Sequence, residues 1–488
     1  MSIMGLETEY GVVVTGLAPG EAQPDPISLS EAVIAAVDAA GTSFSLADEQ
    51  PLVDARGTVL PRHIAHPDLL TDQVTVANRL LANGGRSYVD HAHPEWSGPE
   101  VTTATEALVW DRAGDQLHTA AARAASQRTG LAIHLVKNTT DNKGRSYGRH
   151  ENHLLPRSLP FETIVEQFPG FLASRVVVNG AGRVGIGEAG ERPGFQTSQR
   201  ADFFERLVGL ETTLRRPIIN TRDEPHADRA THRRLHVITG DANLCHVATL
   251  VTIGSASLAL RAITAGARLP QPVDPVAAMR AWSHDPSCTV RQPCTDGTAR
   301  TAVELQQLWA HATEEHLSSE DDALVQRHWR GILDDLAVDP MRCADRLDWV
   351  VKLRLLQGLC QRHGFGWDDP RLQALDLRYA DLTDGLFARL ESSGAVQTIV
   401  DDGDVTAATT RPPVTTRAWL RGTLLERFGT HVVAASWDRI VLATPQGERS
   451  LQLVQPFDGT AAQWHDRIAS TTTIDELTSL FDSLGWRA

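Results

Sequence analysis

Residues 86–95 bring together side chains that could serve a metal-assisted reaction. The strand-forming residues at the start of this run predict a strand over Arg86–Asp90. Alternate residues of a strand share a face, so Arg86, Tyr88 and Asp90 should project together. A cation, a phenol and a carboxylate would then meet on one surface.

The residues that follow add histidines and a second carboxylate. Pro94 cannot donate a hydrogen bond within a central strand pair, so we expect the chain to leave the sheet near His93. Glu95 would then lie just past the strand end. Such a polar cluster suits a metal-assisted site. On composition alone, the same residues also fit a solvated strand end with ordinary surface charges.

A second pair of carboxylates lies near the N-terminus. Residues 5–14 are expected to form a first strand, which puts Glu7 and Glu9 on one face. Two neighbouring carboxylates repel unless a cation or an arginine neutralises them. Magnesium would be a suitable neutraliser because it is a hard ion that prefers oxygen ligands. A solvated strand face is the alternative.

Later polar segments hold further candidates. His150 follows Gly148, a residue that lets backbone approach a ligand, and is a plausible metal-side or phosphate-side group. Arg200 and Arg222 carry guanidinium groups suited to phosphates and carboxylates. His236 lies in a strand expected over 234–243. Each has a structural alternative: a satisfied loop histidine, an ion pair, or a buried hydrogen-bonded histidine.

Composition bounds the class of protein. The chain has 488 residues, 42% hydrophobic and 22% charged, which is typical of a large globular protein. The formal net charge of -15 argues against a general nucleic-acid binder. The 5 cysteines form no C-x-x-C pair, so a reduced cytoplasmic setting fits. Residues 1–10 lack the apolar run of a signal peptide, and no stretch approaches the ~20 apolar residues of a membrane span.

Hydrophobic spacing places the elements that would position these side chains. A helix is expected over 103–127 despite Gly114, and a strand over 131–137. Residues 171–187 look like a hairpin with its turn near Asn179–Gly180. Residues 42–72 lack a clear period and are expected to be mostly a long loop. Further helices are expected over 27–40, 247–267, 303–316, 322–336 and 344–362.

A domain boundary is expected in the acidic, threonine-rich stretch 401–416. We place a linker at 406–416, between a large domain of residues 1–405 and a small α+β domain of residues 417–488. The small domain should contain a helix over 417–428, strands near 436–442 and 451–454, and a last helix over 474–484. That last helix has a capping box formed by Thr473 and Glu476.

Taken together, these motifs resemble the Pup ligase/deamidase family, and more specifically its Pup deamidase/depupylase branch. The resemblance covers nearly the whole chain. It rests on GLETEYG at 5–11, RSYVDHAHPEWSGPE at 86–100, SYGRHEN at 146–152, PGFQTSQR at 193–200, IINTRDEPHAD at 218–228, RRLHVITGDANL at 233–244, DWVVKLRLL at 348–356 and AASWD at 434–438.

The resemblance implies an α+β fold related to glutamine synthetase and the carboxylate–amine ligases. A curved, mainly antiparallel sheet would form a cradle for ATP and Mg²⁺, with helices on its outer face and a small C-terminal domain. The implied roles are magnesium binding by Glu7, Tyr88 and Glu95, phosphate contact by Arg86, catalysis by Asp90, and packing at the nucleotide by Trp437. By position and chemistry we add Glu9, His150 and His236 on the metal side, and Arg200 and Arg222 on the phosphate side.

Two features resemble the hydrolase branch rather than the ligase branch. The ligase pattern has one more residue between the catalytic Asp and Pro-Glu than Asp90-His-Ala-His-Pro-Glu95 has here. The loop carrying Asp54-Ala-Arg56-Gly57, within the 45–72 loop near the site, also resembles the hydrolases. Gly98, by contrast, stands where the ligase carries a threonine.

The implied reaction is an ATP- and Mg²⁺-dependent deamidation of the C-terminal glutamine of Pup, together with cleavage of the Pup–lysine isopeptide. The implied partners are Pup and pupylated proteins in a pathway linked to the bacterial proteasome. A Pup–protein ligase acting through a γ-glutamyl phosphate, a non-catalytic Pup-binding or nucleotide-sensing protein, and a small-molecule amine ligase are the alternatives.

Overall fold

The computed structural model describes residues 2–18, 20–37, 41–46, 49–63, 65 and 77–484. Its centre is a seven-stranded sheet in the order β13-β8-β1-β6-β5-β4-β3, in which every pair is antiparallel. The strands are β1 Met4–Glu9, β3 Gly41–Ser43, β4 Asn78–Leu81, β5 Arg86–Asp90, β6 His93–Ser97, β8 Arg149–Pro156 and β13 His232–Val237.

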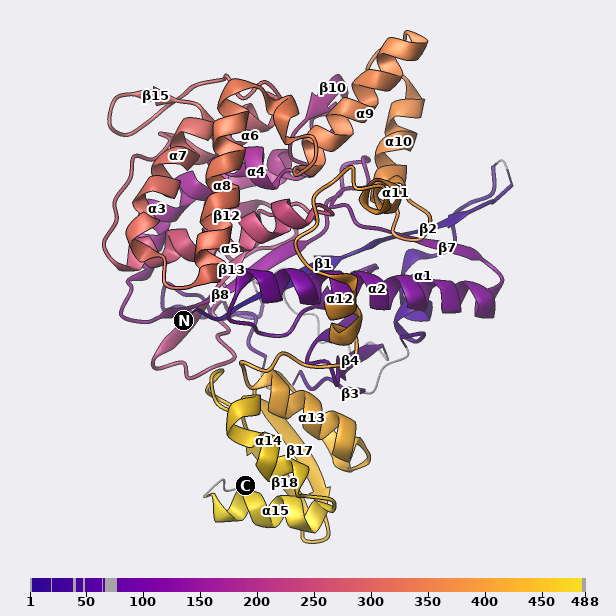
Figure 1. Ribbon diagram of the computed structural model, residues 1–488, viewed down its shortest axis with the longest axis vertical. Coiled ribbons are helices and arrows are strands. Elements are labelled where there is room, and N and C mark those ends of the chain that lie inside the picture. Colours follow the sequence, from indigo (N-terminus) through magenta and orange to yellow (C-terminus); the bar gives the residue numbers. More distant parts are fainter. Residues whose placement is uncertain are drawn as a thin grey trace.

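The long helix α2, Ala104–Thr129, covers one face of this sheet (Figure 1). Thr103 caps its start by accepting a hydrogen bond from the backbone of Glu106, and Gly130 ends it with φ 72°. Gly114 is tolerated inside the helix because the Trp96 ring of β6 lies against it, where an added Cβ would meet that ring at 2.2 Å. The predicted helix is confirmed, and the glycine marks a close helix–sheet contact.

A second layer of helices packs beside the sheet around the aromatic rings of Phe171, Trp309 and Trp329. Helix α5 has the length and composition of a membrane span, but 89% of its apolar window is buried inside the protein, as in a core helix. The helices of the large part, besides α2, are α1 Pro26–Ile34, α3 Phe161–Ser174, α4 Val176–Asn179, α5 His246–Thr264, α6 Pro275–Ser283, α7 Ala302–Ala312, α8 Glu320–Val338, α9 Asp348–His363, α10 Pro370–Ala380, α11 Leu386–Ser392 and α12 Asp402–Ala408.

Four expectations about secondary structure need correction or completion. Residues 171–187 do not form a hairpin: Phe171 belongs to α3, and the Val-rich run after it is the short helix α4, buried among the other helices. The first strand is two strands, because β2 Gly11–Thr15 leaves the main sheet to pair with β7 Ala132–Val136.

Pro94 does not take the chain out of the sheet. The chain turns at His91 and Ala92, and Pro94 continues in β6 opposite Val89 of β5. The Pro94 carbonyl accepts a hydrogen bond from the Tyr10 backbone N–H. Pairing of β1 with β6 ends at Glu9 and Glu95, so the backbone N–H that proline lacks is not required. Glu95 therefore lies inside the sheet.

Residues 42–72 begin with the last residues of β3, and their described part then consists mainly of turns and isolated bridges. Residues 47–48, 64 and 66–72 of this loop lie outside the described residues. The same holds for residues 38–40, at the end of the helix expected over 27–40. The remaining strands of the large part are β9 Arg183–Ile186 with β10 Arg192–Gln196, β11 Phe204–Gly209 with β12 Arg216–Asn220, and β14 Gln292–Pro293 with β15 Ala299–Arg300.

The C-terminal part is a small α+β unit below the sheet edge in the view of Figure 1. Its elements are α13 Ala418–Phe428, β16 Val432–Ala435, β17 Arg439–Thr444, β18 Gly447–Gln452, α14 Ala461–Ala469 and α15 Ile474–Ser483. The Thr473–Glu476 capping box is present. Phe44 and Leu80 of the large part share its hydrophobic core, so the unit packs on the sheet. The domain division itself stays a prediction.

Candidate functional site

The register of three neighbouring strands brings one group of carboxylates together. Glu9 of β1 lies opposite Glu95 of β6, and Glu95 lies opposite Tyr88 of β5. Asp90 stands at the end of β5, beside the turn into β6. Ligand oxygens of Glu9, Asp90 and Glu95 all lie within 4.8 Å of one another. This geometry could hold a cation between three acids.

A second group lies one step along the same face. Glu7 of β1 is opposite His150 of β8, and atoms of Glu7, His150 and His236 lie within 4.8 Å of one another. His150 Nδ1 is 3.2 Å from a Glu7 carboxylate oxygen, and Asn152 donates to the other oxygen at 2.8 Å. Asn152 also contacts His236 Nδ1 at 2.9 Å through its own oxygen. Strands β1, β8 and β13 thus supply one linked polar set.

The surroundings of these acids shift their pKa values in opposite directions. Burial raises the pKa of Glu95 well above its usual range, and the charges of Asp90, Glu9 and Glu7 raise it further. Burial would also raise the pKa of Glu9, but the hydrogen bond and charge of His93 lower it to about 2. For Glu7, the effect of burial is outweighed by His150, His236 and Arg234, which lower its pKa well below its usual range. An added cation would offset the repulsion that adds to the effect of burial in raising the pKa of Glu95.

A cleft of about 1120 Å³, including space open to solvent, lies over these groups. Arg86 lies along its wall between two rings, with its guanidinium 4.0 Å from the centre of Phe44 and 3.8 Å from that of Tyr88. Asn78 accepts a hydrogen bond from Arg86 at 2.9 Å, and a carboxylate oxygen of Glu49 lies 3.6 Å away. Trp437 of the small unit closes part of the cleft.

A smaller cavity of about 550 Å³, including space open to solvent, adjoins the cleft and shares Glu7, Ser97, His226, Arg234 and Trp437 with it. Glu100 and Arg417 also line it, but most of its remaining lining residues are apolar. These lining residues include Met4, Gly5, Gly98, Leu154, Pro225 and Pro456. A planar, mostly apolar group could lie there while a charged group reaches the cleft.

Most of the predicted site residues meet at this cleft. Glu7, Arg86, Tyr88, Asp90, Glu95, His150, Arg222, His236 and Trp437 line it, and Glu9 reaches it through the acid group. Tyr88 lies directly opposite Glu95 on the neighbouring strand, and its hydroxyl is 3.4 Å from Ser97 Oγ. Burial raises the pKa of Tyr88 well above the usual value, and its role as a magnesium ligand stays a prediction.

Arg200 lies outside the lining of the cleft among the described residues. Its guanidinium is buried and donates to Ser146 Oγ at 3.1 Å. Burial and the nearby Arg216 charge lower the pKa of Arg200 to about 9. Arg222 does line the cleft, 3.3 Å from Glu224. The phosphate-side role of both arginines stays a prediction.

Sequence reasoning missed several members of the site. Asn152 and Arg234 lie two residues from His150 and His236 on the same strand faces, and Arg234 donates to Asn152 at 2.9 Å. The period of two already puts Arg234 on one face with His236 in the expected strand, and the same argument applied to β8 would have added Asn152 beside His150. A Glu224 carboxylate oxygen lies 3.6 Å from the Arg234 guanidinium, and no local sequence pattern predicts that ion pair.

Comparison with known proteins decides the family. The family model for Pup-ligase proteins matches residues 2–441. The chain belongs to this family. Among curated relatives, the depupylase of Acidothermus cellulolyticus is 44% identical over 498 residues, covering 97% of this chain and 98% of that protein. The Pup deamidase/depupylase of Mycolicibacterium smegmatis is 45% identical over 456 residues, covering 90% of this chain and 91% of that protein.

Members of the family named as ligases are also similar. A Pup–protein ligase of Micrococcus luteus is 39% identical over 408 residues, covering 79% of this chain and 88% of that protein. Among solved structures, the complex of Pup with its ligase PafA matches with a TM-score of 0.80 at 29% identity, covering 98% of this chain and 95% of that chain. PafA in complex with ADP matches with a TM-score of 0.74 at 30% identity, over 88% of this chain and 99% of that chain. The predicted glutamine-synthetase-like α+β fold, shared with these ligases, is confirmed.

Proposed function

We propose that this protein is an ATP- and Mg²⁺-dependent hydrolase that converts the C-terminal glutamine of Pup to glutamate and cleaves the Pup–lysine isopeptide. The similarity to relatives named depupylase and Pup deamidase/depupylase, at 44% and 45% identity over nearly the whole chain, is the observation that carries the proposal. The two-residue turn between Asp90 and His93 adds support, since the ligase pattern is one residue longer there.

The donor groups fit a hard divalent cation. Glu9, Asp90 and Glu95 offer carboxylate oxygens within 4.8 Å of one another, the ligand type that magnesium prefers. The raised pKa of Glu95 supports the fit, because three close carboxylates cannot all ionise without a neutralising charge. When bound, magnesium would supply positive charge that binds nucleotide phosphates and keeps these acids ionised. Glu7, His150 and His236 form the second candidate ligand group.

The two connected cavities fit a nucleotide. The apolar cavity beside Gly5, Gly98 and Trp437 would take the base and sugar, and the polar cleft would take the phosphates. Arg86 and Arg222 line the phosphate side. The family resemblance implies that ATP acts as a bound cofactor and is not consumed in each bond cleavage. The ADP complex of PafA supports a nucleotide site in this fold.

Asp90 is proposed as the catalytic carboxylate. Its side chain is 38% exposed, at the end of β5, so a substrate carbonyl could reach it from the open cleft. As a nucleophile, it would attack the γ-carbonyl, expel ammonia or the lysine amine, and leave an anhydride that water opens. As a general base, it would take a proton from the attacking water, which contributes about 10²–10⁴-fold. Either route ends with the γ-carboxylate of Pup and a free amine.

The substrate follows from the same chemistry. Deamidation and isopeptide cleavage attack one carbon, the γ-carbonyl of the C-terminal residue of Pup, so one site can serve both. The complex of Pup with PafA supports Pup as the partner on this fold. Pupylated proteins, a functional link to the bacterial proteasome and a cytoplasmic location complete the proposal.

The test is a mass measurement with purified protein, Mg²⁺, ATP and Pup ending in glutamine. We expect a gain of about one mass unit in Pup and release of Pup from a conjugate, with no matching formation of ADP. Asp90→Asn should still bind nucleotide but lose at least about 10²-fold in hydrolysis rate. New conjugates formed from Pup ending in glutamate, with equal amounts of ADP, would overturn the proposal in favour of a ligase. Full hydrolysis by Asp90→Asn would overturn the role of Asp90.

A further inference from the structure

Strand β1 has a second face directly behind the acids of the site. Thr8 stands between Glu7 and Glu9, so its side chain points to the opposite side of the sheet. Its cross-strand partner is Arg149, the residue before His150 in β8. Thr8 is fully buried and Arg149 is 1% exposed. The residues behind the site are thus covalent neighbours of the proposed metal-side residues.

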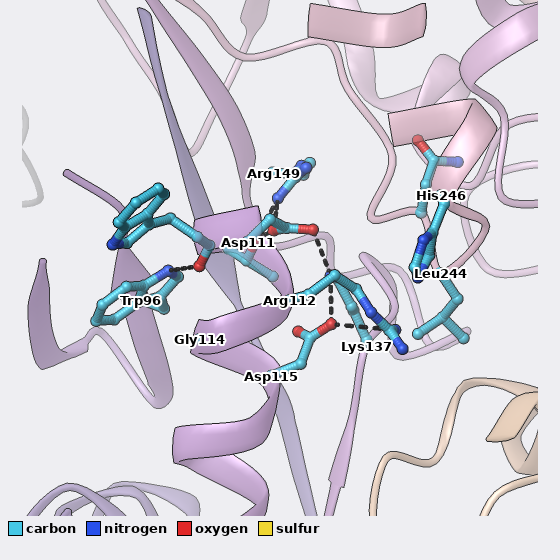
Figure 2. A network of polar contacts seen from close by, with 12 residues as sticks. Trp96, Asp111, Arg112, Gly114, Asp115, Lys137, Arg149, Leu244 and His246 are labelled. Atoms are coloured by element: carbon cyan, nitrogen blue, oxygen red, sulfur yellow. Dashed lines mark hydrogen bonds and ion pairs between the residues drawn. The ribbon is translucent and has the colours of Figure 1, made fainter. Parts of the chain in front are cut away.

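Both residues take part in an ionic network with α2, of which Arg149, Asp111, Lys137 and Asp115 are labelled in Figure 2. The Arg149 guanidinium donates to Thr8 Oγ1 and to Asp111 of α2. Lys137 Nζ lies 2.8 Å from Asp111 and 2.8 Å from Asp115, one turn further along the helix. The hydroxyl of Tyr10, on the same face of the chain as Thr8, donates to Asp115 at 2.9 Å.

The network balances its charges in a dry interior. The side chains of Lys137, Arg149 and Asp111 are at most 2% exposed, and that of Asp115 is 7% exposed. Lys137 and Arg149 therefore face Asp111 and Asp115 with almost no water. Arg112, 3.7 Å from Asp115, extends the network to Glu391. The cost of removing such charges from water offsets much of their attraction, so a buried network of this kind adds little to stability compared with apolar packing.

The neighbouring part of the interface between β1 and α2 is held by apolar packing. At the start of β1, Met4 and Leu6 pack against Ala104, Ala107 and Leu108 of α2. In the described part of the β1–α2 interface, ionic contacts lie where Thr8 and Arg149 back the acids and histidine of the site. Directional hydrogen bonds define the position of a strand more narrowly than apolar contacts do.

We propose that Thr8, Arg149, Asp111 and Lys137 are positioning residues. They hold β1 and β8 so that Glu9 meets Asp90 and Glu95, and Glu7 and His150 meet His236, in the two metal-binding geometries. The inference deepens the proposed function and rests on its metal site. Thr8 links β1 to the network, because its hydroxyl accepts a hydrogen bond from Arg149 and donates one to Asp111 at 3.3 Å. Without that hydroxyl, the segment between Glu7 and Glu9 would lose its polar attachment to α2.

The test measures Mn²⁺ binding to the full chain by electron paramagnetic resonance, in the absence of nucleotide and substrate. Thr8→Val keeps the β-branched shape and removes the hydroxyl. We expect Mn²⁺ affinity to fall about tenfold, the loss of one hydrogen bond to a charged partner. Thr8→Ser, which keeps the hydroxyl, should restore affinity to within about twofold of the unmodified protein.

A matched control separates positioning from general destabilisation. Thr313 is also fully buried, and its hydroxyl donates to Ala310 at 2.9 Å at the end of α7, which packs on α3 and α8. Thr313→Val should lower the melting temperature as Thr8→Val does, with Mn²⁺ affinity unchanged. If Thr8→Val does not fold, Tyr10→Phe serves in its place, because it removes only the hydroxyl that bonds Asp115; about threefold weaker Mn²⁺ binding is expected.

The outcomes are distinct. Weaker binding by Thr8→Val with rescue by Thr8→Ser supports the inference. Binding by Thr8→Val or Tyr10→Phe equal to that of the unmodified protein, or an equal loss in Thr313→Val, overturns it and leaves the network a structural feature. If the unmodified protein binds no Mn²⁺, the metal part of the proposed function fails first, and the inference falls with it.

Discussion

Glu95 should destabilise the metal-free protein at neutral pH. Burial raises the pKa of its carboxyl group well above the usual range, and Asp90, Glu9 and Glu7 add to this because their negative charges lie nearby. A carboxyl group with a raised pKa binds its proton more tightly in the folded state than in the unfolded state. Its contribution to stability is therefore complete at low pH and is lost as the pH rises. Glu95→Gln cannot ionise and should escape that loss.

The size of the effect has an upper bound. An unfolded glutamate has a pKa of about 4.3, and pH 7 lies about 2.7 pH units above it, so at about 1.36 kcal/mol per unit the penalty reaches at most about 3.7 kcal/mol. An unfolding entropy of about 2.1 cal/mol/K per residue gives about 1 kcal/mol/K for 488 residues. In EDTA at pH 7, Glu95→Gln should therefore melt up to about 4 °C higher than the unmodified protein. Near pH 4.3 the difference should vanish.

The assay is thermal unfolding in EDTA at both pH values, repeated with Mg²⁺. Mg²⁺ should reverse the order, because the unmodified protein gains stability by binding the ion whereas Glu95→Gln lacks one carboxylate ligand. Glu448→Gln, at an exposed position of β18, is the matched control and should follow the unmodified protein throughout. A lower melting temperature for Glu95→Gln in EDTA at pH 7, or the same difference at both pH values, would refute the reasoning.

Two further predictions concern the small C-terminal unit. Burial would raise the pKa of Glu100, but the charges of Arg421 and Arg417 lower it well below the usual range, so its stabilising contribution should be present above about pH 4.3 and lost as the pH falls. Glu100→Gln leaves two buried guanidinium groups without their carboxylate and should cost about 3–5 kcal/mol in urea unfolding at pH 7; a loss below about 1 kcal/mol would contradict this. Trp437→Leu should weaken ADP binding about tenfold in a calorimetric titration, because it removes an aromatic ring that lines both cavities; unchanged affinity would place the nucleotide elsewhere.

Glu7, Glu9 and Asp90 were predictable because each lies on a strand whose alternation is visible in the sequence. Glu7 and Glu9 share a face of β1 and meet the face of β5 that carries Tyr88 and Asp90. The expected exit of the chain near His93 was wrong, because a proline can continue a strand where its carbonyl alone is used. Because of that error, Glu95 was expected just past the end of the strand, whereas it lies inside the sheet within β6.

Tertiary packing explains the other large error. The valines at 176–178 have high strand propensity, and Asn179–Gly180 resembles a hairpin turn. In the fold they form a short helix whose residues are all buried, with Val176 and Val177 in the main core cluster. Burial on all sides favours whichever backbone conformation fits the surrounding helices, so a local preference worth about 1 kcal/mol is overridden.

The network behind β1 was invisible for a related reason. Glu7 and Glu9 carry like charges, which indicates in the sequence that a cation should lie near them. Thr8 and Tyr10 carry no charge, so nothing in the sequence indicates that they have charged partners. Their partners in α2 are distant in sequence, 103 residues for Thr8 with Asp111 and 105 for Tyr10 with Asp115. Yet one strand must satisfy both faces at once, because moving β1 by one residue would exchange them. The polar contacts behind the sheet and the acids in front of it are therefore two requirements on the same backbone register, and a substitution on either face should be tested for its effect on the other.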